Sequence, residues 1–258
     1  MQTIPIDIKD NGNELQITIH DVCFTMKKVE GGSFWMGAQN SNPNGVNYDK
    51  YAGRTDGWNE GRDESPVLRV VVDDFYMGET EVSQKLWEAV MGNNPSRHID
   101  SQCDLPIDSV SWYDCQLFIE KLNAITGMSF RLPKEAEWEY AAIGGKTGLR
   151  FKYSGSDELT DVAWMTDNYG VKTHQLKAKE PNALGLYDMT GNVWEWCEDW
   201  YGSYDPSKAQ TSKRKVLRGG GWLNEPSYFR NTYRELAFPN SRYYCFGMRL
   251  ALTKNNNE

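Results

Sequence analysis

The chain has 258 residues, of which 36 are acidic and 28 are basic, so its formal net charge is −8. Clustered positive charge gives proteins most of their affinity for nucleic acids, so the acidic balance excludes a protein built mainly to neutralise phosphates. Hydrophobic residues make up 39% and charged residues 25% of the chain, which excludes a disordered or fibrous protein, and no apolar run is long enough to span a bilayer. The 10 Trp, 14 Tyr, 9 Phe and 23 Gly indicate short elements, long loops and aromatic-lined surfaces.

The first predicted elements are strands. Residues 15–38 alternate apolar and polar side chains and close on Gly31-Gly32, and residues 67–78 (VLRVVVDDFYMG) form a further strand. The polar residues 39–65 between them form a loop that a compact domain should not carry without a use. We assign residues 1–28 to an N-terminal strand extension.

Two helices follow with clear start and stop signals. The first is capped by Ser83 and stops at Gly92. The second begins at a capping box formed by Ser111 and Asp114 and ends at Gly127. Its apolar positions recur at helical spacing: Cys115, Phe118, Ile119, Leu122 and Ile125.

The last predicted helix has Pro133 at its first helical position and runs to Gly144. Residues 145–258 contain no further predicted helix, and their abundant Gly, Asn and Trp predict loops and short strands. A second polar loop spans residues 202–215, and residues 253–258 form a frayed tail. The sequence therefore predicts one loop-rich α+β domain.

The cysteines and histidines support no catalytic site. The five cysteines are scattered and include no CxxC pair, which argues against zinc and redox motifs. Cys115 and Cys197 have apolar neighbours and are predicted to pack as small hydrophobes. The three histidines are too far apart in the sequence to indicate a catalytic metal or a triad. They are His20, His98 and His174.

The N-terminus has neither the basic start nor the apolar stretch of a secretory signal. We therefore expect a cytoplasmic protein, or an exported one if the chain is a mature or trimmed form.

Three segments identify a family resemblance. They are RLPKEAEWEYAA at 131–142, PNALGLYDMTGNVWEWCEDWYG at 181–202, and the stretch at 216–252 that begins VLRGGGW. Together with GGSFWMG at 31–37, they resemble the formylglycine-generating enzyme family, also called the sulfatase-modifying-factor domain. The resemblance covers residues 29–252 in the family's order. It implies a single domain with a variant of the C-type lectin-like fold.

The residues that would hold copper are missing. Members of the family that oxidise a substrate cysteine with oxygen use two cysteines, which follow an Arg-Gly-Gly motif and hold copper(I). Here the motif is Arg218-Gly219-Gly220, and the two positions fall on Asn224 and Phe229. Monovalent copper requires soft thiolates, so neither residue can replace a cysteine. This departure argues against copper and against formylglycine generation.

The resemblance also implies a structural calcium ion. It assigns the ligands to the side chains of Asp188 and Glu195 and to the backbone carbonyls of Gly191 and Val193. Oxygen ligands of this kind suit a hard cation. Alternatively, Asp188 caps a turn and Glu195 pairs with a buried arginine, Arg218 or Arg249 being the candidates. A second family site would fall near residues 162–168, where no carboxylate aligns securely.

Other polar and aromatic residues are predicted to be structural. Glu198 and Asp199 are expected to form a solvated or arginine-paired turn and not an acid–base pair. Four tryptophans are expected in the core because aromatic side chains bury large areas. They are Trp194, Trp196, Trp200 and Trp222.

The C-terminal segment is the candidate binding surface. Its frame residues keep the family's spacing: Arg230, Arg234, Pro239, Arg242, Gly247 and Arg249. In the implied fold, the residues between them line an exposed surface, and tyrosine gives such surfaces large contact area at low conformational cost. The candidate ligand-binding residues are Leu223, Asn224, Glu225, Ser227, Tyr228, Tyr233, Glu235, Tyr243, Tyr244 and Cys245. The competing interpretation is that the tyrosines only close the core.

Three functional hypotheses follow. The first is a non-catalytic module that binds a protein or a small ligand at the aromatic surface. The second is a divergent oxidoreductase of the same family, acting on a peptide or a small molecule. The third is a receptor-binding variable protein of a diversity-generating retroelement, which the C-terminal segment also resembles. In those systems adenine mutagenesis of AAC codons cannot produce Glu, so Glu225 and Glu235 would have to be unvaried.

Overall fold

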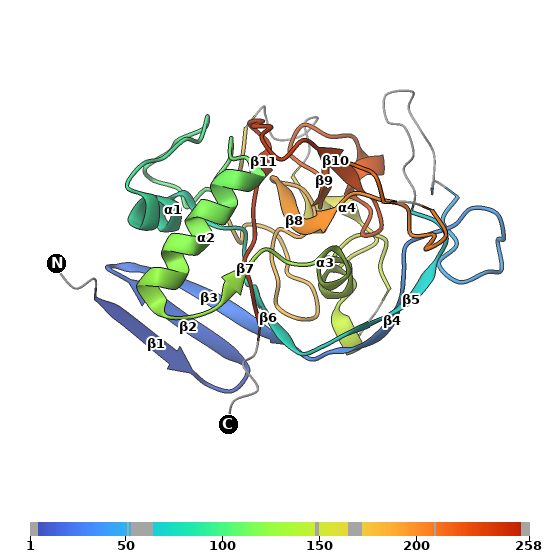
Figure 1. The fold of residues 1–258 in the computed structure, drawn as a ribbon, viewed down its shortest axis with the longest axis horizontal. Coiled ribbons are helices and arrows are strands. Elements are labelled where there is room, and N and C mark those ends of the chain that lie inside the picture. The colour runs from blue at the N-terminus through green and yellow to red at the C-terminus, as the bar shows by residue number, and fades with distance from the viewer. Residues whose placement is uncertain are drawn as a thin grey trace.

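The computed structural model describes residues 5–50, 52, 64–147, 150–164, 172–208 and 210–253. A six-stranded sheet holds both ends of the described chain (Figure 1). Its last strand in sequence is inserted between two earlier ones, which ties the C-terminal end to the N-terminal half. In spatial order the strands are β1 (Ile6–Asp10), β2 (Glu14–Ile19), β3 (Val22–Val29), β6 (Phe75–Gly78), β12 (Ala251–Thr253) and β7 (Phe130–Arg131).

The single strand predicted at residues 67–78 is two strands in two sheets. β5 (Leu68–Val72) pairs with β4 (Gly32–Met36) in a separate ribbon, whereas β6 belongs to the six-stranded sheet. At the break, the Gly31 N–H donates to the Asp74 carboxylate at 2.8 Å. A Cβ at Gly31 would lie 2.3 Å from the Val72 carbonyl oxygen, so only glycine permits this close approach.

A third sheet carries the C-terminal segment. Its strands lie in the order β10 (Glu235–Ala237), β9 (Lys215–Arg218), β8 (Trp194–Trp200) and β11 (Phe246–Gly247). β11 runs parallel to β8, and the other two pairings are antiparallel. The chain leaves this sheet after β9, returns to it at β10 and enters it again at β11. The sheet therefore fixes both ends of residues 219–245, which contain the candidate surface.

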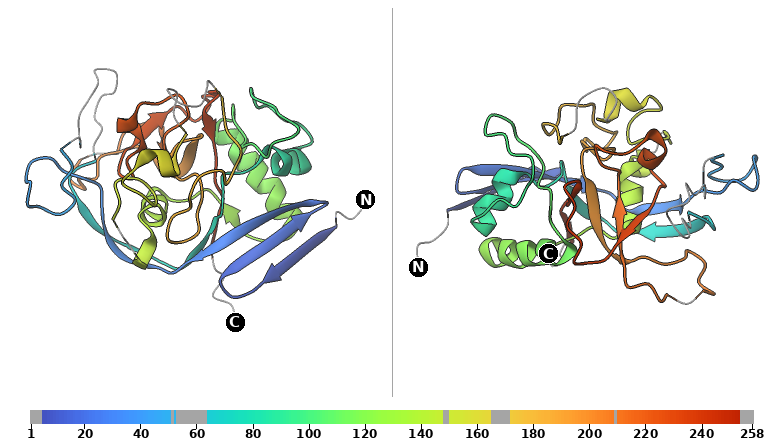
Figure 2. Two further views of the ribbon diagram at one scale, coloured as in Figure 1. Left: turned by 180° about the vertical axis from the view of Figure 1, so that it is seen from behind. Right: turned by 90° about the horizontal axis from the view of Figure 1, so that it is seen from above.

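The two capped helices are confirmed. α1 (Gln84–Met91) has Ser83 at its N-cap, and α2 (Trp112–Thr126) has the Ser111–Asp114 capping box. Gly92 and Gly127 end them in the left-handed conformation, with φ of 76° and 71°. The two helices contact each other, and α1 packs against β3 while α2 packs against β7; Figure 2 shows both helices on the six-stranded sheet from two further sides.

Helix α3 (Glu135–Ala142) begins later than predicted, because Lys134 and not Pro133 occupies the capping region. The expectation of no helix beyond residue 144 is also wrong, although the helical pieces there are single turns. They are η1 (Gly145–Thr147), α4 (Leu159–Val162) and η2 (Pro226–Phe229). Of the predicted tail, Thr253 belongs to β12 and residues 254–258 lie outside the described part. The predicted loop at 39–65 is described only at 39–50, 52 and 64–65.

Two hydrophobic clusters form most of the core. The larger joins α1 and α2 to β2, β8 and the C-terminal segment, and it includes the stacked rings of Trp87 and Phe118, whose centroids are 4.9 Å apart. The smaller lies around α3 and contains Trp138 and Cys197. Both Cys197 and Cys115 are fully buried, as predicted. No helix in the described ranges is long and apolar enough to cross a membrane.

Three of the four predicted core tryptophans are buried, namely Trp194, Trp196 and Trp222. The prediction for Trp200 is wrong, since its side chain is 52% exposed at the end of β8. There its indole ring covers the buried Lys215, whose charged end lies 4.0 Å from the ring centre.

Candidate functional site

Buried ion pairs hold the C-terminal segment against the rest of the protein. Arg218, fully buried at the end of β9, reaches two carboxylates of α3, Glu135 and Glu139. Arg234 joins Glu135 through two hydrogen bonds of 2.6 and 2.8 Å. Although burial opposes ionisation, Arg234 and Arg218 together hold the pKa of Glu135 below its ordinary value. Helix α3 therefore acts as an anionic support for the segment.

The remaining frame arginines are also paired. Arg230 makes two hydrogen bonds of 2.6 Å to Glu64, and Arg242 joins Asp114 of the α2 capping box at 2.7 Å. Arg242 is more exposed than the others, with 57% of its side chain accessible. These pairs anchor the segment at several points, and the residues between them are left to form its surface.

The candidate surface residues divide by burial. Glu225, Ser227 and Tyr243 are exposed, and five others are half-buried, namely Leu223, Asn224, Tyr228, Glu235 and Tyr244. Tyr233 and Cys245 are 2% and 6% exposed and belong to the larger core cluster. Their assignment to the exposed surface is therefore corrected: they form part of the layer beneath it.

The aromatic rings of this region form two groups, each of which contains a core tryptophan. Tyr244 lies 5.7 Å from Trp222 and 6.1 Å from Tyr243, measured between ring centroids. Tyr228 lies 4.9 Å from Tyr233, which in turn contacts Trp194. The tyrosines therefore pack on the tryptophans of the core. The exposed Tyr243 belongs to an outer layer, as a binding surface requires, whereas the buried Tyr233 belongs to an inner layer that closes the core.

Sequence reasoning missed a neighbouring segment that extends the surface. The Arg97 guanidinium lies 4.6 Å from the ring centre of Tyr244, and His98 contacts Trp222 edge-on at 5.4 Å. His98 and His174, distant in the sequence, line one cavity of about 530 Å³. No spacing motif joins these two histidines, so the sequence carried no signal for this cavity. Burial, with smaller contributions from Lys172 and Lys179, lowers the pKa of His174 to about 4.

Both positions of the family's copper cysteines are occupied by structural side chains. The Asn224 carboxamide accepts the Gly221 N–H at 2.8 Å and thereby closes a turn. Phe229 is 1% exposed and packs in a small cluster with residues of α4. The nearby Cys245 offers no substitute thiolate, because burial, with Asp108 and Glu235, raises the pKa of its thiol to about 12.

The predicted calcium ligands lie among buried acidic side chains. Glu195 is fully buried and pairs with Arg249 at 2.7 Å, as the alternative interpretation expected, and Trp138 donates to its second oxygen at 2.7 Å. Asp188 accepts the Lys177 N–H through Oδ2, while its buried Oδ1 has no hydrogen-bond partner among the described residues.

Glu81, which sequence reasoning missed, adds a third buried carboxylate. It accepts the Val193 N–H and the Asn192 side-chain amide, each at 2.9 Å. Burial and the neighbouring Asp188 and Glu195 raise the pKa of Glu81 well above its ordinary value.

The three buried carboxylates of Asp188, Glu195 and Glu81 thus share one buried arginine, Arg249. This excess of negative charge fits a bound cation. Burial is also the main reason that the pKa of Asp188 rises to about 6. The described residues contain no group of three His, Cys, Asp or Glu side chains arranged for a metal, so backbone carbonyls would have to complete the ligand set. The second candidate calcium region is described only at residues 162–164, and its residues 165–168 lie outside the described part.

The adjacent carboxylates Glu198 and Asp199 have different roles. Asp199 accepts the Glu135 N–H at 2.7 Å at the start of α3, and Glu198 accepts from the Gln116 side chain at 3.1 Å. They lie in β8 and not in a turn, and neither has an arginine partner among the described ion pairs. The predicted solvated or arginine-paired turn is therefore wrong.

Comparison with known proteins agrees with this geometry. The family model of the sulfatase-modifying factor enzyme 1-like domain (FGE-sulfatase) matches residues 20–254. The chain belongs to this family. Its sheet-rich single domain with few helices is similar to the C-type lectin-like fold of known members, as predicted.

Two relatives with similar sequences carry different protein names. A protein named chaperone protein LppX from Paenibacillus barcinonensis is 33% identical over 208 residues, covering 60% of this chain and 71% of the relative. The formylglycine-generating enzyme of Streptomyces coelicolor is 34% identical over 171 residues, covering 57% of this chain and 52% of the enzyme. The match thus spans about half the length of that enzyme.

Two solved structures have similar folds. Treponema denticola variable protein 1 has a TM-score of 0.77 and 29% identity, and the match covers 93% of this chain and 99% of that one. PvdO from Pseudomonas aeruginosa has a TM-score of 0.70 and 22% identity, covering 98% and 100%. The second likeness concerns the fold alone.

Proposed function

We propose that this chain is a non-catalytic binding module of its family, which holds a protein or other ligand against the surface formed by residues 223–245. The observation that carries the proposal is the replacement of both copper positions, since Asn224 closes a turn and Phe229 fills the core. The exposed polar and aromatic side chains nearby are of the type that recognition surfaces use.

A copper assay separates this function from the oxidase alternative. We expect no tight copper(I) binding, and no oxygen uptake with a cysteine-containing sulfatase peptide, because the chain offers no pair of accessible thiolates at the family position. The Streptomyces coelicolor relative, assayed in parallel, serves as the positive control. Stoichiometric copper binding or turnover would instead favour a divergent oxidoreductase acting on a peptide or small molecule.

The surface itself is tested with Tyr243→Ala, alone and combined with Tyr244→Ala. Tyr243 is 57% exposed, so its loss should leave the melting temperature almost unchanged while weakening signals that the wild type gives on protein and glycan arrays. Val71→Ala is the control, because Val71 is also exposed, at 75%, and lies in β5, outside the segment. Unfolding of the single variant, or retention of every array signal, contradicts the proposed surface.

A second candidate function is that of a variable protein of a diversity-generating retroelement. The likeness to Treponema denticola variable protein 1 favours it. Comparison of this gene between isolates should then reveal substitutions confined to adenine-derived codons in the segment. Glu225 and Glu235 should be constant, since AAC-derived codons cannot encode Glu. Variation at these two positions, or none anywhere in the segment, argues against this function.

We also propose a structural calcium ion held by Asp188, Glu195 and the carbonyls of Gly191 and Val193. The support is the orphan Oδ1 of Asp188 together with the excess of buried acid around Arg249. A ligand that binds only the folded state at a concentration 100-fold above its Kd stabilises it by about 2.7 kcal/mol.

Chelation tests the ion. EGTA should lower the melting temperature of the wild type, and added Ca²⁺ should restore it. Asp188→Asn should abolish most of this sensitivity while leaving the Glu195–Arg249 pair in place. Equal melting temperatures with and without EGTA in the wild type would contradict the site.

A further inference from the structure

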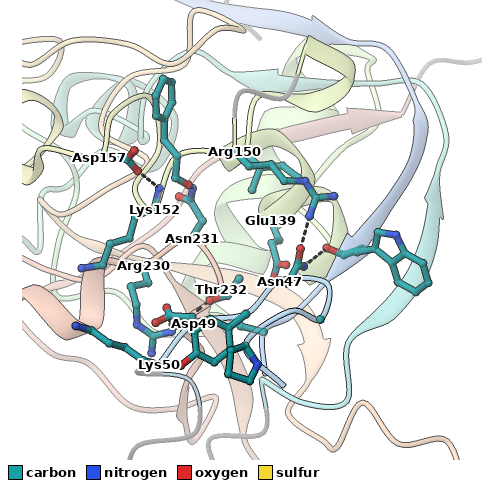
Figure 3. A pocket seen from close by; sticks show the side chains of 17 residues that line it. Asn47, Asp49, Lys50, Glu139, Arg150, Lys152, Asp157, Arg230, Asn231 and Thr232 are labelled. Carbon is teal, nitrogen blue, oxygen red and sulfur yellow. Dashed lines mark hydrogen bonds and ion pairs between the residues drawn. The ribbon is translucent and has the colours of Figure 1, made fainter. Parts of the chain in front are cut away.

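A polar cavity of about 850 Å³ contains none of the candidate ligand-binding residues, although Arg230, Asn231 and Thr232 in its wall belong to the same C-terminal segment (Figure 3). Its walls come from β4, the loop at 38–50, the segment at 150–157 and the residues after η2, and α3 contributes Glu139. Segments from four parts of the chain thus converge on one concave site of the size that small ligands occupy.

One wall presents an unsatisfied acceptor. Asn231 is 3% exposed, and its side-chain amide donates to the Phe151 carbonyl oxygen at 3.1 Å. Its Oδ1 accepts no hydrogen bond from any described residue. A buried acceptor without a donor costs about 1–3 kcal/mol, so a ligand N–H or O–H at this point would remove a penalty.

The cavity also presents an uncompensated cation. Arg150 is exposed and hydrogen-bonds the neutral carboxamide of Asn47, and it forms no ion pair with any described carboxylate. The acids of the cavity are engaged by partners other than Arg150. Asp49 pairs with Arg230 at 3.1 Å, and Asp157 accepts the Lys152 N–H at 2.8 Å.

Glu139, the third acid of the cavity, pairs with the buried Arg218 and accepts the Gly37 N–H at 2.6 Å. The exposed Lys50 and Lys152 add positive charge to the rim. Two half-exposed rings, Trp35 at 40% and Tyr48 at 41%, supply flat apolar area on the same walls.

We propose that this cavity binds a small organic anion whose carboxylate or phosphate meets Arg150 and whose body carries an N–H or O–H donor for Asn231 Oδ1. The guanidinium fork is suited to either anion. The aromatic walls would cover the flat or apolar part of the ligand body, so anion, donor and apolar area are recognised together.

Calorimetric titration of the full chain tests this with matched probes. The anions are glucuronate, glucose 6-phosphate and N-acetyltyrosine, and their neutral partners are glucose and N-acetyltyrosine amide. At least one anion should bind about tenfold or more tightly than its neutral partner, because a hydrogen bond to a charged group contributes about 1.5–3 kcal/mol. The two sugar anions distinguish carboxylate from phosphate. No binding of any anion at about 10 mM, a concentration that would reveal even millimolar affinity, overturns the proposal.

Variants localise the binding. Arg150→Gln should weaken it by about tenfold or more, whereas Arg214→Gln, which removes an exposed charge outside the cavity, should leave it unchanged. Equal losses in both would mean non-specific charge attraction and would overturn the site. If glucuronate binds, its per-O-methyl ether, which keeps the charge and loses the O–H donors, should bind more weakly; equal affinity would refute the role of Asn231. The Tyr243→Ala/Tyr244→Ala variant should retain anion binding, which keeps this test separate from that of the proposed function.

Discussion

At the scale of single residues, buried charge is the feature that defines this protein. Glu195 and Arg249 are both fully buried, and the guanidinium also donates to the carbonyls of Gly78 and Tyr187 at 2.9 and 2.8 Å. One side chain therefore connects β6, β8 and the loop that carries the candidate calcium ligands. Such a pair adds little net stability over an apolar one, yet the loss of one partner leaves an uncompensated charge.

We therefore expect Arg249→Met to reduce the free energy of unfolding by about 3–5 kcal/mol, because Glu195 would remain buried without its partner. Arg242→Met is the matched control: its pair with Asp114 is largely exposed and should be worth no more than about 1 kcal/mol. Urea denaturation measures both variants. Similar losses in the two would mean that burial does not govern the cost.

At the scale of elements, local signals were the most predictable part of the fold. The caps at Ser83 and Ser111 and the stops at Gly92 and Gly127 were all predicted, because each depends on residues within one helical turn. The division of residues 67–78 between two sheets was missed. It is set by Asp74, which accepts a hydrogen bond from Gly31, and a contact across the chain leaves no periodic signal.

The α2 capping box allows a test at this scale. Ser111 accepts the Asp114 N–H at 3.2 Å, and its own N–H donates to the Asp114 carboxylate at 2.8 Å. Ser111→Ala should cost about 1–2 kcal/mol. Ser83→Ala, which removes a single cap bond from α1, should cost about 0.5–1 kcal/mol.

Chemical denaturation gives both values for the two cap variants. A cost for Ser111→Ala no greater than that for Ser83→Ala would mean that the second bond of the Ser111 hydroxyl, which donates to Asp114 Oδ2 at 2.6 Å, contributes nothing. Because Asp114 also holds Arg242, a larger loss would indicate that the box supports the C-terminal segment as well as α2.

At the scale of the whole molecule, the family frame was predictable and the identity of its partners was not. The family motifs gave the chain order of the frame arginines, whereas the pairing of Arg218 with Glu135 and Glu139 depends on how α3 packs under β9. The cavity around Asn231 was missed for the same reason. Its walls come from segments that no sequence motif links.

The N-terminal boundary of the domain is open to a direct test. The family match begins at residue 20, whereas β2 lies before it and buries Leu15, Ile17 and Ile19 in the larger core cluster. β1, at the edge of the sheet, is exposed along its whole length. The sequence-based extension at residues 1–28 thus contains β1, which is exposed, and β2 and most of β3, which contribute to the core.

Deleting residues 1–10 should therefore change the free energy of unfolding only slightly, because it removes exposed side chains from a sheet edge. Deleting residues 1–19 removes three buried aliphatic side chains worth about 1.5–3 kcal/mol each, a total comparable with the 5–15 kcal/mol that holds a typical domain folded. We expect that truncation to unfold or aggregate, as judged by circular dichroism and size-exclusion chromatography. A stable, cooperative fold for residues 20–258 would instead establish that β2 is an appendage and that the family boundary is also the physical one.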